Sequence, residues 1–338
     1  MADPGLPVQD PARSPRWRVF TPPRGAIDGA AGPQHLLYTR AEHNRLELTV
    51  VSRDTGERLL QHAVPYADAP WASLLHDGLL LVAFGNQQVR VLVLDPATGA
   101  ASELAPPGGY SFRPRLVELG EEVLLLGWQS ALPPDQAVAA DAPPTGAQRS
   151  CVLAVHPRAG TSRVAWCARQ GWVPAWLYGG VGEVSWPSPA TQSSGCLQWL
   201  RMRPGGEVQS VAPNRALCGA RGLVDLAGWQ VAQRAERAGL SPVIVATDGT
   251  RRLSLGTSST FVACGRHIYW AAATRGIDPD TVYRWLPGAT YREVAFRLDA
   301  ADRLAVAAPN CTDGVLSVAV VSADVSGHLV ELRSLNRP

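Results

Sequence analysis

The stretch "VRVLVLDPATGAASEL", Val89–Leu104, has the pattern of a β-hairpin: an apolar run, a polar turn and a second short run. In the turn, Asp95 can hydrogen-bond to nearby backbone, and Gly99 accepts a positive φ without steric cost. The stretch "LELTVVSRDTGERLL", Leu46–Leu60, has the same form. Two such hairpins in succession predict a repeated β unit.

The repeat contains a second, preceding hairpin. Such hairpins begin at Ser73 ("SLLHDGLLLVAF"), Leu116 ("LVELGEEVLLLGW"), Ala175 ("AWLYGGVGEVSW"), Leu223 ("LVDLAGWQVAQ"), Phe261 ("FVACGRHIYWAA") and Ala308 ("APNCTDGVLSVAV"). A four-stranded unit that recurs every roughly 40 to 60 residues is typical of propeller blades. We therefore predict an all-β, seven-bladed β-propeller. Six blades are expected near residues 24–65, 66–107, 108–170, 171–216, 217–258 and 259–298.

The remainder, 299–338, contains only three candidate strands: "DRLAVAAPNC", "GVLSVAVVS" and "HLVELRSL". The segment "RWRVFTP", Arg16–Pro22, can supply the fourth, which would hide a sheet edge that otherwise invites aggregation. Blade 7 is therefore expected to be 299–338 plus 16–22, within a single propeller domain over 16–338. Residues 1–15, rich in Pro, Ala and Asp, are expected to be a disordered leader. The competing prediction is a pair of β-sandwiches.

The turn Asp95-Pro-Ala-Thr-Gly99 resembles the D-x-x-T-G-like turns of pyrroloquinoline-quinone-type and related bacterial propeller repeats. The resemblance covers most of the chain and implies a propeller fold. The tryptophan docking motif of the quinone enzymes is not regular here, and the Gly-His and Trp-Asp signatures of WD-repeat proteins are absent. We expect no cofactor.

Composition excludes several functions. The formal charge is +2, and all 31 cationic residues are arginine, so a Schiff-base lysine and a Walker-type phosphate lysine are ruled out. The arginines alternate with 29 acidic residues and form no dense basic block, which argues against a nucleic-acid partner. No run approaches the roughly 20 apolar residues that a membrane span needs.

The six cysteines take paired positions in the repeat. An antiparallel hairpin would place Cys151 beside Cys167, the next blade would place Cys196 beside Cys218, and Cys264 and Cys311 end the first strands of neighbouring blades. Three disulfides would indicate a periplasmic or secreted protein whose targeting segment is not in this chain. Six buried free thiols in a cytosolic protein are the alternative. No pair has the C-x-x-C spacing of a zinc site.

The loops between blades carry an aromatic set that suits stacking on a sugar ring or a peptide, with arginines to pair with carboxylate. These candidate ligand residues are Tyr66, Trp71, Tyr110, Phe112, Arg113, Trp172 and Trp176, with Arg169 and Arg215 nearby. Aromatics at such positions also wedge between blades and fill the core. The remaining strand tryptophans, Trp128, Trp199, Trp229, Trp270 and Trp285, are expected to pack in the core.

Catalytic signatures are absent: no nucleophile elbow, dinucleotide loop, EF-type calcium loop or histidine pair with metalloprotease spacing occurs. Asp278 and Asp280 either bind calcium or form a turn around Pro279. Gln129–Arg149 is either a lid or a surface insertion. We predict a non-catalytic, monomeric, extracytoplasmic propeller that binds a protein or carbohydrate. The alternative is a glycosidase or lyase that uses carboxylates such as Asp68 and Asp225 at a channel mouth.

Overall fold

The computed structural model describes residues 5–11, 15–65, 71–85, 89–130, 148–168, 177–191, 197–211, 215–234, 242–258, 260–273, 278–299, 304–323 and 327–336. Apart from a three-residue 3-10 helix at Arg215–Leu217, the regular elements of these residues are β-strands. None of the described helical structure has the length and apolarity to cross a bilayer. The chain forms two compact units, residues 1–40 with 213–338 and residues 41–212.

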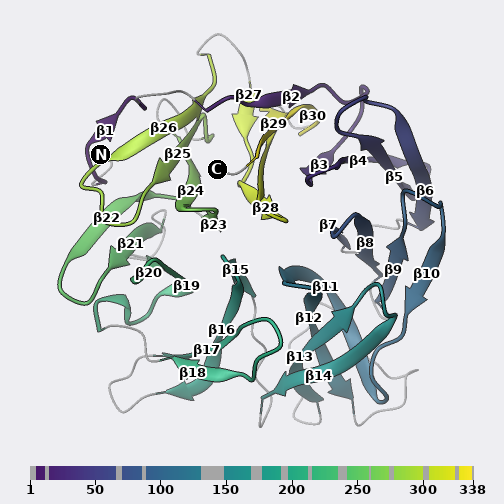
Figure 1. The fold of residues 1–338 in the computed structure, drawn as a ribbon, viewed down its shortest axis with the longest axis horizontal. Helices are drawn as coiled ribbons and strands as arrows, with labels where there is room; N and C mark the ends of the chain where they lie inside the picture. The colour runs from purple at the N-terminus through teal and green to yellow at the C-terminus, as the bar shows by residue number, and fades with distance from the viewer. Residues whose placement is uncertain are drawn as a thin grey trace. The chain divides into compact units, whose positions relative to one another are not determined.

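Residues 41–212 contain three complete four-stranded sheets, whose strands pair in chain order as antiparallel neighbours (Figure 1). The first sheet is β7 (Trp71–His76), β8 (Leu79–Phe84), β9 (Arg90–Leu94) and β10 (Ala101–Leu104). The second is β11 (Tyr110–Leu119), β12 (Glu122–Ser130), β13 (Gln148–His156) and β14 (Thr161–Cys167). The third is β15 (Tyr178–Gly180), β16 (Glu183–Thr191), β17 (Leu197–Met202) and β18 (Gln209–Val211).

Residues 1–40 with 213–338 contain three more sheets. One is β19 (Arg221–Leu226), β20 (Trp229–Arg234), β21 (Val243–Thr247) and β22 (Arg252–Thr257). The next is β23 (Val262–Cys264), β24 (His267–Ala272), β25 (Thr281–Trp285) and β26 (Arg292–Arg297), with β1 (Val8–Gln9) at its edge. The last is β27 (Leu304–Val306), β28 (Asn310–Thr312), β29 (Val315–Ser322) and β30 (Leu329–Asn336), with β2 (Arg18–Phe20) at its edge.

The seventh sheet is β3 (Asp28–Ala31), β4 (His35–Glu42), β5 (Arg45–Ser52) and β6 (Arg58–Pro65). The hairpin of β5 and β6 and that of β9 and β10 are the two stretches whose similarity predicted the repeat. In the second of these, Asp95 accepts hydrogen bonds from the Ala97 backbone N–H (2.9 Å) and the Thr98 hydroxyl (2.9 Å). Gly99 has a φ of 71°, as the turn requires.

Closure of the last sheet by the N-terminal strand is confirmed. Arg18, Val19 and Phe20 of β2 pair antiparallel with Ser334, Arg333 and Leu332 of β30. The predicted strand "DRLAVAAPNC" is split into β27 and β28, which both pair with β29. Pro309 separates the two pieces, because proline lacks the N–H that a continuous ladder needs.

The expected disordered leader is wrong at Val8–Gln9. These residues form β1, which pairs in parallel with Arg292 and Glu293 of β26. The segment is ordered because the backbone of a sheet edge offers unpaired hydrogen-bonding groups, and a Pro- and Ala-rich segment can still use them. Residues 1–4 and 12–14 lie outside the described residues.

Two predicted disulfides are present. Cys151 and Cys167 lie opposite each other on β13 and β14, with Cα atoms 4.0 Å apart. Cys264 and Cys311 join β23 to β28, with Cα atoms 5.6 Å apart. Cys218 is also disulfide-bonded; its predicted partner, Cys196, lies outside the described residues.

The core consists mainly of strand residues packed between neighbouring sheets. Trp128, Trp199, Trp229, Trp270 and Trp285 are all buried, as predicted for packing residues. Of the predicted insertion Gln129–Arg149, residues 129–130 belong to β12 and residues 148–149 to β13; residues 131–147 lie outside the described residues.

Candidate functional site

Four of the predicted ligand residues lie at the beginnings of β7 and β11. Trp71 is the first residue of β7, and Tyr110 is the first residue of β11. The two strands are in contact, and a bridge between Val89 and Phe112 connects their sheets at this end. Trp71, Tyr110 and Arg113, which we call the β7/β11 surface, are partly exposed. The other predicted residues, Tyr66, Trp172 and Trp176, and nearby Arg169, lie outside the described residues.

Phe112 is a correction to the predicted ligand set. Its side chain is only 1% exposed and packs in a core cluster with Trp128 and Leu153. Phe112 therefore packs between sheets. This is the core-filling role given above as the alternative to ligand binding for the loop aromatics. An aromatic ring gains more from complete burial among apolar side chains than from a half-solvated position.

Arg113 is held in place by an aromatic ring beneath it. Its guanidinium carbon lies 4.6 Å from the ring centroid of buried Trp128. A cation over an indole face is attracted by the ring quadrupole, so the guanidinium is pre-oriented at the start of β11. Trp128 is thus both a core residue and the support for Arg113.

Gly127 lets β11 and β12 approach closely beside this pair. A Cβ at this position would lie 2.6 Å from the Ser111 carbonyl oxygen and 2.6 Å from Leu153 Cδ1. The Cys151–Cys167 disulfide lies next to this contact, because Gly127 pairs across the sheet with Cys151. The Tyr110 hydroxyl donates to Cys167 Sγ over 3.9 Å, which positions the Tyr110 ring.

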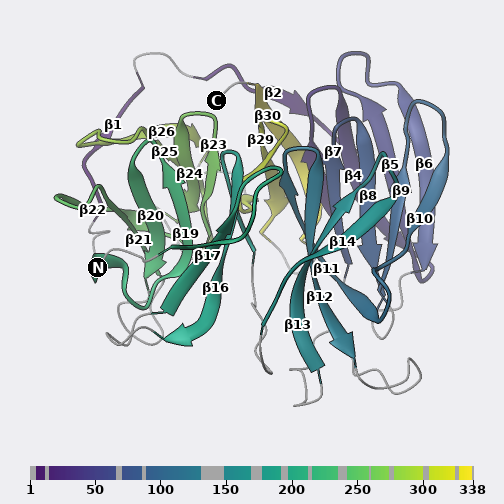
Figure 2. The same ribbon diagram turned by 60° about the horizontal axis from the view of Figure 1, so that its bottom comes forward.

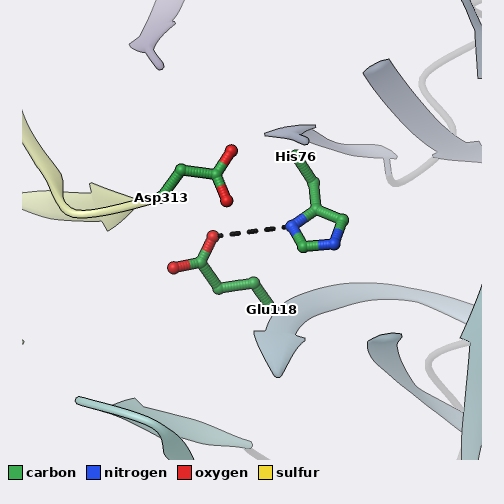
Figure 3. Close-up of side chains that lie close together, drawn as sticks. All are labelled: His76, Glu118 and Asp313. Atoms are coloured by element: carbon green, nitrogen blue, oxygen red, sulfur yellow. Dashed lines mark ion pairs between the residues drawn. The ribbon is translucent and has the colours of Figure 1, made fainter. Parts of the chain in front are cut away.

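A second polar group lies at the opposite ends of the same two strands. Figure 3 shows His76 and Glu118, from the ends of β7 and β11 respectively, with Nδ1 of His76 3.8 Å from a carboxylate oxygen of Glu118. His76 is buried, whereas the Glu118 side chain is 27% exposed. Six strand residues place this pair about 17 Å along β7 from Trp71.

His76 and Glu118 are not among the site residues predicted from the sequence, although a signal for them exists there. Each stands two residues before the glycine of its first-hairpin turn, Gly78 and Gly120, so they occupy equivalent positions in consecutive repeats. An alignment of the repeats by these glycines would have paired them.

Charged turn residues surround this end of the two sheets. Arg158, in the β13–β14 turn, donates to the Asp77 side chain and, over 2.5 Å, to the Asp77 carbonyl oxygen. The hydrogen bond from Arg158 to the Asp77 carboxylate holds the pKa of Asp77 below its ordinary value. His156 Nε2 lies 3.5 Å from a carboxylate oxygen of Glu121. Arg158, Asp77 and Glu121 are exposed, and exposed pairs of this kind add little stability.

Asp280, one of the two carboxylates considered for calcium, is engaged by neighbouring residues. Asp280 Oδ1 accepts the Thr281 hydroxyl hydrogen bond at 2.9 Å, and the Asp280 backbone bonds to Ala272 and Leu298. Asp280 is therefore held at the start of β25 by hydrogen bonds to the ends of the flanking strands.

The two carboxylates predicted for a glycosidase are Asp68 and Asp225. Asp68 lies outside the described residues, and Asp225 lies half-buried in β19. Arg215 is exposed in the 3-10 helix.

Comparison with solved structures identifies proteins with a similar fold. No protein-family model and no curated protein sequence matches this chain. Among solved structures, the β-propeller domain of the Trilobed protease from Pyrococcus furiosus aligns with a TM-score of 0.58 at 9% identity, covering 94% of this chain and 95% of that one. The polysaccharide lyase Uly1 aligns with a TM-score of 0.58 at 10% identity, covering 94% and 91%. YCF48 bound to D1 peptide aligns with a TM-score of 0.54 at 9% identity, covering 98% of each chain.

These similarities show the fold alone. With its seven sheets, the chain is an all-β protein with the seven-bladed β-propeller fold. The resemblance to pyrroloquinoline-quinone-type repeats finds no support beyond that fold. The Trilobed protease domain has an open velcro topology, whereas here β2 pairs with β30.

Proposed function

We propose that this chain is a non-catalytic β-propeller that binds a protein or glycan bearing a carboxylate through the β7/β11 surface. The observation that carries this proposal is the Arg113 guanidinium carbon, 4.6 Å from the ring centroid of Trp128. Arg113 lies on β11, which begins at partly exposed Tyr110 and contacts β7, whose first residue is partly exposed Trp71. A stacked guanidinium presents several N–H donors in a fixed plane, which suits a carboxylate.

The rigidity of this surface supports a binding role. Trp128 is buried, Gly127 keeps the strands close, and Cys151–Cys167 ties β13 to β14 beside Tyr110. A preformed site loses little side-chain entropy when it binds a ligand. The aromatic rings offer faces for a sugar ring or a peptide, and propellers include both a polysaccharide lyase and a protein bound to a peptide.

The test is a binding screen with the purified full-length chain. An array of glycans with and without uronic acids, and a library of peptides with free or amidated C-termini, separate the two ligand classes. The Arg113→Ala substitution is expected to weaken binding of the best ligand about 10- to 100-fold, the loss of a charged hydrogen bond.

Arg115→Ala is the matched control, because Arg115 is an exposed arginine two residues further along β11. It is expected to change affinity less than twofold. Equal losses from the two substitutions would show a general charge effect and would contradict the assignment of Arg113. Binding that is unchanged by Arg113→Ala and Trp71→Ala would remove the site.

We also assign the chain, as part of this proposal, to an extracytoplasmic compartment and to a monomeric state. Two disulfides support the compartment, because such bonds persist in oxidising surroundings. Alkylation under denaturing, non-reducing conditions is expected to label no thiol, including those of the predicted pair Cys196–Cys218. Labelling of two or more cysteines would contradict the compartment, and a dimer mass by light scattering would contradict the monomer.

An enzyme, a glycosidase or lyase, is the second candidate, and His76 with Glu118 is the observation in its favour. A histidine and a carboxylate at 3.8 Å are a combination used in general acid–base catalysis. If the chain cleaves a uronic-acid polysaccharide, Glu118→Gln is expected to abolish product formation while Arg115→Ala preserves it. Absence of cleavage by the unmodified chain would exclude this candidate.

A further inference from the structure

The N-terminal segment adds a strand to a sheet that is already complete. β23 to β26 form a four-stranded antiparallel sheet, and β1 joins its edge in parallel, with Val8 opposite Arg292 and Gln9 opposite Glu293. The Arg292 backbone N–H donates to the Pro7 carbonyl oxygen over 2.9 Å. Figures 1 and 2 both show β1 alongside β26.

Gly5 lies on a bridge between two sheets. Arg292 is buried, its Nη1 donates to the Leu255 carbonyl oxygen of β22 over 2.9 Å, and its guanidinium lies 4.4 Å from the Tyr283 ring centroid. A Cβ on Gly5 would lie 2.5 Å from Arg292 Nη1 and 2.8 Å from the Leu255 oxygen. Only a residue without a side chain fits against this bridge.

Leu6 provides the apolar contact of the segment. It packs against a core cluster formed by residues of β19 to β25, including Leu255 and Tyr283. Val8, in contrast, is 44% exposed, so the pairing residues themselves bury little apolar surface. Specificity thus comes from Gly5 and Leu6, and the strand pairing supplies backbone hydrogen bonds.

The second half of the N-terminal segment is anchored separately. Trp17 Nε1 donates to the Ala295 carbonyl oxygen over 2.9 Å, and its ring lies 6.0 Å from that of Phe296. Phe20 of β2 stacks on Tyr38 of β4 with ring centroids 6.0 Å apart. The anchoring contacts of Trp17 and Phe20 therefore do not involve residues 5–9.

We propose that the edge of β26, with Arg292 and the Leu6 contact surface, is a docking site for an extended peptide, and that residues 5–9 of the same chain are its resident ligand. The mode is addition of a strand to a sheet edge, in which backbone pairing gives affinity and side-chain positions give selectivity. The site requires three features in the peptide: a glycine that packs against the Arg292 side chain, an apolar residue at the next position, and then a backbone carbonyl that accepts a hydrogen bond from the Arg292 N–H. The β26 edge belongs to a different unit from the β7/β11 surface, so loss of binding at one site would not contradict the assignment of the other.

The test vacates the site in the full-length chain and refills it from solution. The Gly5→Val substitution removes the resident segment, and a fluorescent peptide with the sequence of residues 1–11, MADPGLPVQDP, is then titrated by anisotropy. The peptide is expected to bind this variant at least tenfold more tightly than the unmodified chain, whose site is occupied at the high local concentration of a tethered ligand. Gly108→Val is the matched control, because a Cβ there meets no atom within 4 Å.

Hydrogen exchange gives a second readout. The Arg292 amide is expected to exchange faster in the Gly5→Val chain and to regain protection when the peptide is added. A peptide with valine in place of glycine should restore nothing. Equal peptide binding by the Gly5→Val and Gly108→Val chains, or unchanged exchange of the Arg292 amide, would overturn the proposal. If the Gly5→Val chain does not fold, Leu6→Ser is tested with the same readouts, because it weakens the apolar anchor without a steric clash.

Discussion

Removal of the Cys264–Cys311 disulfide is expected to cost more stability than removal of Cys151–Cys167. The first joins the neighbouring sheets that contain β23 and β28 and spans 47 residues of sequence, whereas the second lies within one hairpin and spans 16. In the chain-entropy account, a cross-link stabilises by limiting the unfolded chain, and the effect grows with loop length. The expected losses in unfolding free energy are about 4 kcal/mol and about 3 kcal/mol respectively.

Guanidinium unfolding of the two double variants, Cys264→Ala with Cys311→Ala and Cys151→Ala with Cys167→Ala, measures these losses. Because alanine also removes buried sulfur atoms, the control is a chain that retains only Cys264 and Cys311, compared in its oxidised and reduced forms. Equal unfolding free energies of those two forms would show that the Cys264–Cys311 cross-link adds no stability. A larger loss for the 16-residue loop would refute the ordering.

Three further predictions concern single residues. Burial raises the pKa of the Tyr269 phenol to about 12, an effect partly offset by Arg284. An unfolded tyrosine ionises near pH 10, so the unfolded chain loses this proton first as the pH rises. The unfolding free energy should therefore fall between about pH 10 and 12 by on the order of 2–3 kcal/mol. Tyr269→Phe should flatten that fall, and an unaltered slope would contradict the assignment. Gly127→Val, which places a Cβ against the Ser111 carbonyl, should lower the thermal midpoint by several degrees, whereas Gly108→Val should leave it unchanged. Asp95→Ala should cost about 1 kcal/mol in urea unfolding by removing the acceptor for Ala97 N–H, and Asp95→Asn should restore most of it; equal losses would show that the acceptor is not the cause.

The repeat made most of the fold predictable. Turn chemistry such as Asp95 with Gly99 marks the hairpins, and the hairpins fix the register that paired Cys151 with Cys167 and Cys264 with Cys311. Closure by Arg18–Phe20 followed from counting strands, because an unpaired edge is unfavourable.

Other features depend on contacts between distant segments and had no local signal. Val8 and Gln9 form a strand only because β26 presents a free edge, and Phe112 is buried only because its strand begins against a neighbouring sheet. Arg113 was recognised as a ligand candidate, but its support by Trp128 across β11 and β12 was not. The sequence thus indicated which residue types lie at the start of β11, but not which of them are buried or which side chains contact one another.

The pairing of β2 with β30 also governs how this chain is made. β2 ends at Phe20 and β30 begins at Leu329, so at 5–20 residues per second the earlier strand waits on the order of half a minute for its partner. Until then β29 has an open side that can join a foreign chain. Premature termination before Leu329 is therefore expected to yield products that precipitate or are degraded, so synthesis of β30 decides whether the chain stays in solution.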